Sequence, residues 1–330
     1  MKALSPQSLV IHDTAPIVDG ASVRETLTRS IDLARLADEL GYGRYWTAET
    51  HGMRAVASCS PEVVCAAAAG ATQQVRIGAA GVLLPNHSPL LVSERFGTLE
   101  ALYPDRIDLA LGRSLGGPRT AADVIRNDRD NSVSGAARQI DALIGYFRNE
   151  YHNGTRSVTG YGYEPQLWIL GTSTSSAALA AERGLPYAFG GHLNYNAIDD
   201  GIATYHNAAE QTPGRKYLAV SVSVIAADTR TEAEHLAESH RMKVMQRRVH
   251  QRRIYLPSPD VAARARPTDP ALLREYEGAT AGFVIGDASE VRQALASLQE
   301  RTQADELIVS TPVFEHEARM RSYRLVAGCS

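Results

Sequence analysis

The segment from Val75 to Gly117 constrains the fold most strongly, because it contains two short apolar runs separated by a helical pattern. Ser88-Pro89 predicts a helix start, since serine caps free backbone N–H groups and proline fits the first turn. The second run, Ile107 to Leu111, leads directly into Gly112-Arg113. An arginine at the carboxyl end of a buried strand needs an anionic partner. This pattern is typical of a parallel α/β protein with its ligand site at the strand ends.

The same alternation of apolar runs and helical patterns continues along the whole chain, and it predicts eight strand–helix units in 330 residues. We therefore expect an α/β fold, a (β/α)8 TIM barrel forming a single domain over residues 1–330. Two segments, about 119–163 and 257–280, are expected to be insertions at the carboxyl-end mouth, and 257–270 is expected to be a loop. A doubly wound sheet is the alternative, but no G-x-G-x-x-G follows the first strand.

Composition excludes several classes of function. The formal net charge is −3, and 22% of residues are charged, so neither nucleic acid nor a membrane surface is an expected partner. The basic segment Arg241–Arg253 is expected to be a solvated helix face. Three scattered cysteines form neither a disulfide framework nor a zinc site, and Cys65 is expected in the core. Without a signal peptide or a long apolar stretch, we expect a cytoplasmic protein.

Two neighbouring strand ends offer groups suited to a phosphate. The segment LGTSTSS (170–176) lies between a strand and a helix, where free backbone N–H groups and hydroxyls can bind a dianion. Arg113, at the end of the preceding strand, can pair bidentately with the same group. An ordinary helix cap would also explain the serines, so it is the combination with Arg113 that favours an anion site.

Other strand ends carry candidate residues of less specific meaning. The small residues 78–82 would let a flat ligand lie against the backbone, although tight packing explains them too. His51 follows the second strand and is a candidate catalytic residue, and a packed structural role is its alternative. Histidines and acids lack metal-ligand spacing, so no metal is expected. Three more side chains at strand ends are expected to line a substrate pocket: His12, Thr50 and His192.

Four motifs in order resemble the bacterial luciferase-like flavin-dependent monooxygenases, closest to the single-chain members described as alkanal monooxygenase-like. They are RYWTAETHGM (44–53), VRIGAAGVLLPNHSPLLVSERFGTLEALYPDRIDLALGR (75–113), PQLWILGTSTSSAALAAERGLPYAFGGH (165–192) and ADELIVSTPVFEHEARMRSY (304–323). The resemblance covers most of the chain apart from about 119–163 and 195–280.

The resemblance implies FMN, used as FMNH2, as the cofactor. Ala80-Gly81 matches the position where family members hold a non-prolyl cis peptide under the flavin ring, and Leu115 would pack near that ring. The FMN phosphate would be held by Arg113 together with Thr172, Ser173 and Ser176. Reduced FMN would react with O2 to give a C4a-hydroperoxide that oxygenates a small organic substrate. A separate flavin reductase would supply FMNH2, and a homodimer is expected.

One departure from the family pattern concerns the residues after the second strand. The family commonly has Glu-His-His there, whereas this chain has Glu49-Thr50-His51, and Thr50 cannot accept a proton near neutral pH. This departure motivates one alternative, a non-catalytic flavin-binding barrel. An F420-dependent oxidoreductase on the same fold is the other alternative. The sequence does not distinguish hydroxylation, epoxidation and Baeyer–Villiger oxidation, and it does not identify the substrate.

Overall fold

The computed structural model describes residues 4–126, 132–148, 150, 154–210, 216–251 and 254–329. In this part of the chain, parallel strands close into a barrel because β6 pairs with β7 and β9 pairs with both β7 and β1. The predicted (β/α)8 barrel is therefore confirmed. The barrel strands, in order around the ring, are β1 (Leu9–Asp13), β2 (Arg44–Thr47), β3 (Arg76–Leu83), β4 (Ile107–Gly112), β5 (Gln166–Gly171), β6 (Tyr187–Phe189), β7 (Leu218–Ala227) and β9 (Glu306–Ser310).

The remaining strand of the described sheet, β8 (Val284–Asp287), lies beside the barrel and not within it. Residues 219–223 of β7 pair with β9, and residues 224–227 pair with β8. β7 is ten residues long, so it extends beyond the ring and carries β8 on the extension. β8 is thus an outer strand, and β9, which completes the ring, comes later in the sequence.

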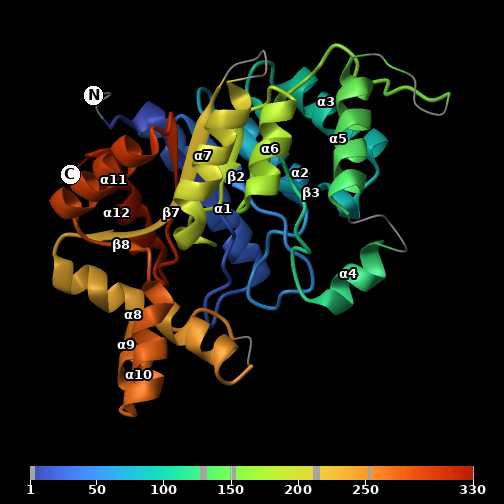
Figure 1. The fold of residues 1–330 in the computed structure, drawn as a ribbon. Coiled ribbons are helices and arrows are strands. Elements are labelled where there is room, and N and C mark those ends of the chain that lie inside the picture. Colours follow the sequence, from blue (N-terminus) through green and yellow to red (C-terminus); the bar gives the residue numbers. More distant parts are fainter. Residues whose placement is uncertain are drawn as a thin grey trace.

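Helices surround the barrel, as Figure 1 shows. Those outside the two insertion segments are α1 (Val23–Glu39), α2 (Pro61–Gly70), α3 (Pro89–Leu102), α6 (Thr174–Glu182), α7 (Ile198–Ala209), α8 (Arg230–Arg248), α11 (Ala288–Thr302) and α12 (His316–Ala327). Local sequence signals account for several starts. At α1, Ser22 Oγ accepts from the Glu25 N–H at 3.2 Å, and Glu25 accepts from the Ser22 N–H at 2.8 Å. This reciprocal pair is a capping box.

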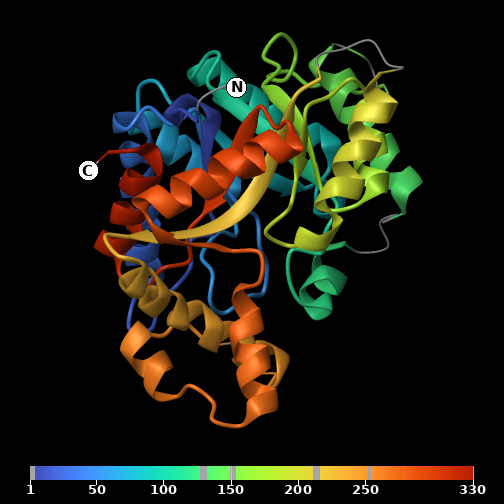
Figure 2. The same cartoon turned by 60° about the vertical axis from the view of Figure 1, so that its left-hand side comes forward.

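Both expected insertion segments contain helices. The first, 119–163, holds α4 (Arg119–Arg126) and α5 (Val133–Phe147), while its residues 127–131, 149 and 151–153 lie outside the described part. The second holds α9 (Pro259–Arg264) and α10 (Pro270–Glu277), which Figures 1 and 2 show standing clear of the barrel.

The prediction of a loop at 257–270 is wrong, because α9 begins inside it. Ser258 caps α9 through the Val261 N–H, and Asp269 caps α10 through two backbone N–H groups. In both helices proline follows the cap at the first helical position. Ser-Pro and Asp-Pro are helix-start signals, and here they produce two short helices.

The amino-terminal end of the barrel interior is filled by buried charges. Arg44 Nη1 lies 2.7 Å from Asp108 and Arg44 Nε lies 2.8 Å from Glu306, and the guanidinium lies 4.9 Å from the Trp168 ring. Arg44 and Glu306 are the first residues of β2 and β9. Because each charge is paired, this end can be both polar and closed. The open end is therefore the one formed by the carboxyl ends of the strands.

Two further expectations concern the surface and the core. Cys65 is buried in α2, as predicted. The basic segment 241–253 is only partly a solvated face, because Arg241 is buried and bonded to Glu238 at 2.9 Å and to Glu234 at 2.5 Å. Its residues 252 and 253 lie outside the described part. Of the helices that the structure describes, none combines the length and apolarity needed to cross a bilayer.

Candidate active site

A cavity of about 520 Å³ opens at the carboxyl ends of the barrel strands. Its wall is mainly apolar, with Leu83, Leu111, Ile169 and Leu170 among the contributors. Most of the side chains singled out in the sequence meet there, namely His12, Thr50, Ala80, Gly81, Arg113, Thr172, Ser173, Ser176 and His192. The structure thus brings together residues from six different strand ends that lie far apart in the sequence.

Arg113 and the start of α6 form a polar corner of this cavity. Arg113 Nη2 lies 3.4 Å from Ser175 Oγ, and Ser175 Oγ lies 3.0 Å from Ser173 Oγ. Among the described residues of the wall, Arg113 is the one lysine or arginine. Ser173 precedes α6, so the first N–H groups of the helix face the same corner. A cation, hydroxyls and free N–H groups together suit a phosphate.

The hydroxyls of Ser175 and Ser176 at this corner have different surroundings. Ser176 is buried, and its Oγ donates to the Ser173 carbonyl at 2.8 Å and contacts the Tyr187 hydroxyl at 3.0 Å. Ser175 is exposed and lies nearer to Arg113. Ser176 was predicted from the sequence and Ser175 was not. Ser175 occupies the second helical position, where a side chain lies beside the open helix end, and this position is visible on a helical wheel.

The floor of the cavity next to β3 is made of small residues. The peptide bond between Ala80 and Gly81 is cis, as the resemblance implied. A side chain at position 81 would meet the Leu170 side chain and the Ala110 carbonyl, so glycine is required by close packing. The small residues leave space at this part of the cavity wall, the low wall at Ala80 and Gly81, and a flat ring can lie against it.

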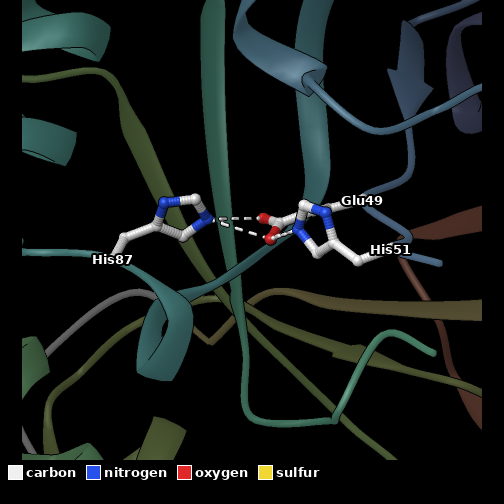
Figure 3. Close-up of side chains that lie close together, drawn as sticks. All are labelled: Glu49, His51 and His87. Carbon is white, nitrogen blue, oxygen red and sulfur yellow. Dashed lines mark hydrogen bonds and ion pairs between the residues drawn. The ribbon is translucent and has the colours of Figure 1, made fainter. Parts of the chain in front are cut away.

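His51 does not reach the cavity wall. Its Nε2 donates to Glu49 Oε1 at 2.7 Å, and His87 Nε2 lies 2.9 Å from the same oxygen, on the other side of the carboxylate in Figure 3. Glu49 itself lines the cavity and is buried. His51 therefore contacts the site through Glu49. His87 was not predicted, and its only sequence signal is its place after β3.

Glu49 is held as a carboxylate by its neighbours. Burial by itself would raise the pKa of its carboxyl group, but hydrogen bonds from His87, the Leu83 N–H and His51 outweigh burial and lower it. Asn86 Nδ2 adds a further bond of 3.1 Å. The ligand atoms of the glutamate and the two histidines lie within 4.8 Å of one another, a spacing that could hold a metal ion. The carboxylate instead lies between the two rings and takes their hydrogen bonds (Figure 3), so we interpret the group as a hydrogen-bonded cluster.

Two other predicted residues differ in their surroundings. Thr50 lines the cavity, and its hydroxyl lies 3.3 Å from the Ser58 carbonyl and 3.2 Å from Ser58 Oγ. Its side chain is therefore used to hold the 49–58 loop. Leu115 is exposed and does not contribute to the cavity wall, and its packing near a flavin ring stays a prediction.

His12 and His192 lie together on one side of the cavity, with ring centroids 5.5 Å apart. Burial lowers the pKa of His12, and it lowers the pKa of His192 to about 3, with a smaller contribution from His12. Both imidazoles are therefore neutral near neutral pH.

Relatives of related sequence match this chain over nearly its whole length and over nearly their own. One is 36% identical over 316 residues, 95% of this chain and 94% of its own length, and is described as a luciferase-like monooxygenase of Escherichia coli (strain K12). Another, 27% identical and covering 97% of both chains, is the N-acetyl-S-alkylcysteine monooxygenase of Bacillus subtilis (strain 168).

Solved structures share the fold. Apo-MsnO8 superposes with a TM-score of 0.89 at 35% identity over 97% of both chains. The oxygenating constituent of 3,6-diketocamphane monooxygenase from Pseudomonas putida, in complex with FMN, superposes with a TM-score of 0.72 at 20% identity, over 98% of this chain and 97% of that one. An F420-dependent secondary alcohol dehydrogenase does so with a TM-score of 0.70 at 14% identity over 97% of both. The last two show likeness of fold alone.

Residues 8–305 match the family described as luciferase-like monooxygenase. This match covers nearly the whole chain and agrees with the relatives of similar sequence. The chain therefore belongs to the luciferase-like monooxygenase family, which confirms the prediction of an enzyme of the flavin-dependent monooxygenase kind.

Proposed function

We propose that this protein is a two-component monooxygenase that binds FMNH2 in the cavity and inserts one atom of O2 into a small organic substrate. The observation that carries the proposal is the corner formed by Arg113, Ser173 and Ser175 at the start of α6. Its donors match a phosphate monoester such as the end of FMN. When bound, reduced FMN supplies the electrons that activate O2.

The chain's own residues would orient the cofactor from its two ends. Arg113 and the α6 hydroxyls hold the phosphate, while the low wall at Ala80 and Gly81 supports the ring system. Apolar side chains around this wall, including Leu83 and Leu170, keep water from the reacting atoms. Exclusion of water matters because reduced flavin and O2 otherwise yield hydrogen peroxide instead of oxygenated product.

Glu49 and His51 would act on the same side of the cavity. Glu49 presents a buried carboxylate to the bound molecules, and His51 and His87 fix its position from behind. We propose His51 as a positioning residue, since the structure does not place its ring in the cavity. This replaces the direct catalytic role expected from the sequence.

The test of the phosphate site is the affinity for FMN, measured by flavin fluorescence, and for FMNH2, measured by anaerobic titration. Arg113→Ala should weaken binding by about 1–3 kcal/mol, or roughly 5- to 150-fold, because it removes a charge-assisted hydrogen bond. Arg113→Lys should retain part of the affinity. Arg24→Ala, an exposed arginine of α1, is the matched control. Unchanged affinity in Arg113→Ala would overturn the assignment.

The second candidate is an F420-dependent oxidoreductase, because an F420-dependent secondary alcohol dehydrogenase has the same fold. The phosphate corner would suit F420 as well, because that cofactor also carries a phosphate. Parallel anaerobic titrations with FMNH2 and reduced F420 separate the two functions. Tight binding of F420 with weak binding of FMNH2 would favour the second. Binding of FMNH2 with no product from any substrate would favour a non-catalytic flavin-binding barrel.

Two partners belong to the proposal. A separate flavin reductase would supply FMNH2. A homodimer would cover the apolar side chains that α2 and α3 expose, Val63 (64% exposed), Leu91 (47%) and Leu102 (65%). Light scattering of wild type and of Val63→Asp with Leu102→Asp tests the dimer, and a monomeric wild type would exclude it.

A further inference from the structure

The paired imidazoles of His12 and His192 give the cavity a polar side that the proposed cofactor site does not use. His12 is in β1 and His192 follows β6, two strands that β7 and β9 separate in the ring. Their planes are tilted by 51°. The neighbouring cavity wall is apolar, with Trp46, Ala188 and Ile308. Polar groups placed in an apolar pocket set the orientation of the molecule bound there.

The hydrogen bonds of the two rings define what they can still bind. His12 Nε2 lies 3.0 Å from the Ala80 carbonyl, and because a carbonyl only accepts, Nε2 carries the proton. His12 Nδ1 is then a lone pair, and it is buried without a partner in the described part of the chain. His192 Nδ1 lies 2.5 Å from Ser221 Oγ. No described residue bonds to His192 Nε2, which leaves that nitrogen for a ligand.

The two imidazoles bring no charge to the cavity. Burial keeps both rings neutral, and the charged groups that act on His12, Asp13 and Arg319, are paired with each other at 2.7 Å. A carboxylate or an ammonium placed against the rings would lose hydration and gain no opposite charge from them. An uncharged hydroxyl or carbonyl would lose less and could exchange a hydrogen bond with His192 Nε2.

We infer that His12 and His192 select the substrate: they receive one uncharged oxygen group of an otherwise apolar molecule and reject its carboxylate or ammonium counterpart. This inference rests on the proposed function, because it assumes that the phosphate corner is taken by the cofactor. His192 is the group that contacts the substrate oxygen. His12 is a positioning residue that holds the His192 ring and the Ala80 carbonyl in place.

The test uses decan-1-ol, decanoate and decylamine as probes with the FMN-loaded protein, and titration calorimetry as the measurement. Decan-1-ol should bind at least about tenfold more tightly than either ion, a factor equal to about 1.4 kcal/mol. His192→Leu should lose that preference for the alcohol, and His192→Gln, which keeps a polar atom near the Nε2 position, should retain most of it.

A readout other than affinity comes from ring-nitrogen NMR of histidine-labelled protein. Decan-1-ol should shift the His192 Nε2 resonance and leave that of His240, a partly buried histidine of α8, unchanged. FMN fluorescence quenching reports on folding and on the cofactor site in each variant.

The two hypotheses fail in different ways. If wild-type protein binds neither FMN nor FMNH2, the proposed function fails. If FMN binds but decan-1-ol does not, or decanoate binds equally well, or His192→Leu keeps the preference, the selection by the histidines is wrong and the proposed function stands.

Discussion

Glu49 receives more hydrogen bonds from side chains than its place in a strand-end loop would suggest. His51, His87 and Asn86 all donate to it, and the Leu83 N–H bonds the second oxygen at 2.9 Å. A buried carboxylate with these donors is both charged and fixed in position. His51 therefore acts by holding the Glu49 carboxylate in position. Its removal should affect the reaction of the bound flavin with O2 more than the affinity for flavin.

His51→Ala tests this point at the residue scale. We expect FMN affinity to stay within about twofold of wild type, since His51 does not line the cavity. Loss of one hydrogen bond to Glu49, about 1 kcal/mol, should change the rate at which H2O2 appears from bound FMNH2 and O2 by about fivefold. His250→Ala, an exposed histidine, is the control. An unaltered H2O2 rate in His51→Ala would return His51 to a purely structural role.

Several helices of this fold begin at short capping sequences. Ser88-Pro89 predicted the start of α3 correctly, and similar signals, Ser22 with Glu25 and Ser60-Pro61, precede α1 and α2. Ser258-Pro259 and Asp269-Pro270 are signals of the same kind before α9 and α10. The prediction of a loop there gave more weight to the prolines and arginines of the segment. Capping acts over three or four residues, so it is visible in the sequence. Where a capped helix then packs depends on distant partners.

Packing of α3 gives a prediction at the scale of elements. A methyl group at Gly97 would meet the Thr159 carbonyl and the Gly160 Cα, so this glycine lets the 157–160 turn lie on the helix. Gly97→Ala should destabilise the protein by about 1–3 kcal/mol, measured by urea unfolding. Gly278→Ala, where a methyl group would meet nothing within 4 Å, should change stability by less than about 1 kcal/mol. Equal stability of the two variants would contradict this packing.

The stability of the whole molecule should depend on pH through its buried histidines. Burial lowers the pKa values of His192 and His240 to about 3, and it lowers that of His12 as well. Below about pH 6.5 the unfolded chain takes up protons at these positions while the folded chain does not. The folded state therefore loses stability as the pH falls from 6.5 toward 3.

Urea unfolding at pH 7, 6 and 5 measures this effect. The free energy of unfolding should fall with decreasing pH, by up to about 1.4 kcal/mol per pH unit for each such histidine. The paired carboxylate of Asp13, whose pKa is lowered to about 2, stays ionised over this range and adds no slope. His240→Gln should reduce the slope. Stability that is constant or higher at pH 5 would mean that these histidines become protonated in the folded protein.

The barrel, Arg113 at the end of β4 and Ser173 before α6 could be predicted from the sequence, because strand patterns, helix caps and strand ends are set by residues close in the chain. Three features were decided only by the tertiary structure. β8 lies outside the ring, His51 turns toward Glu49, and His12 meets His192, 180 residues away in the sequence. Each feature depends on contacts between residues far apart in the sequence, which form only when the strands close into the barrel. The local sequence does not determine these contacts.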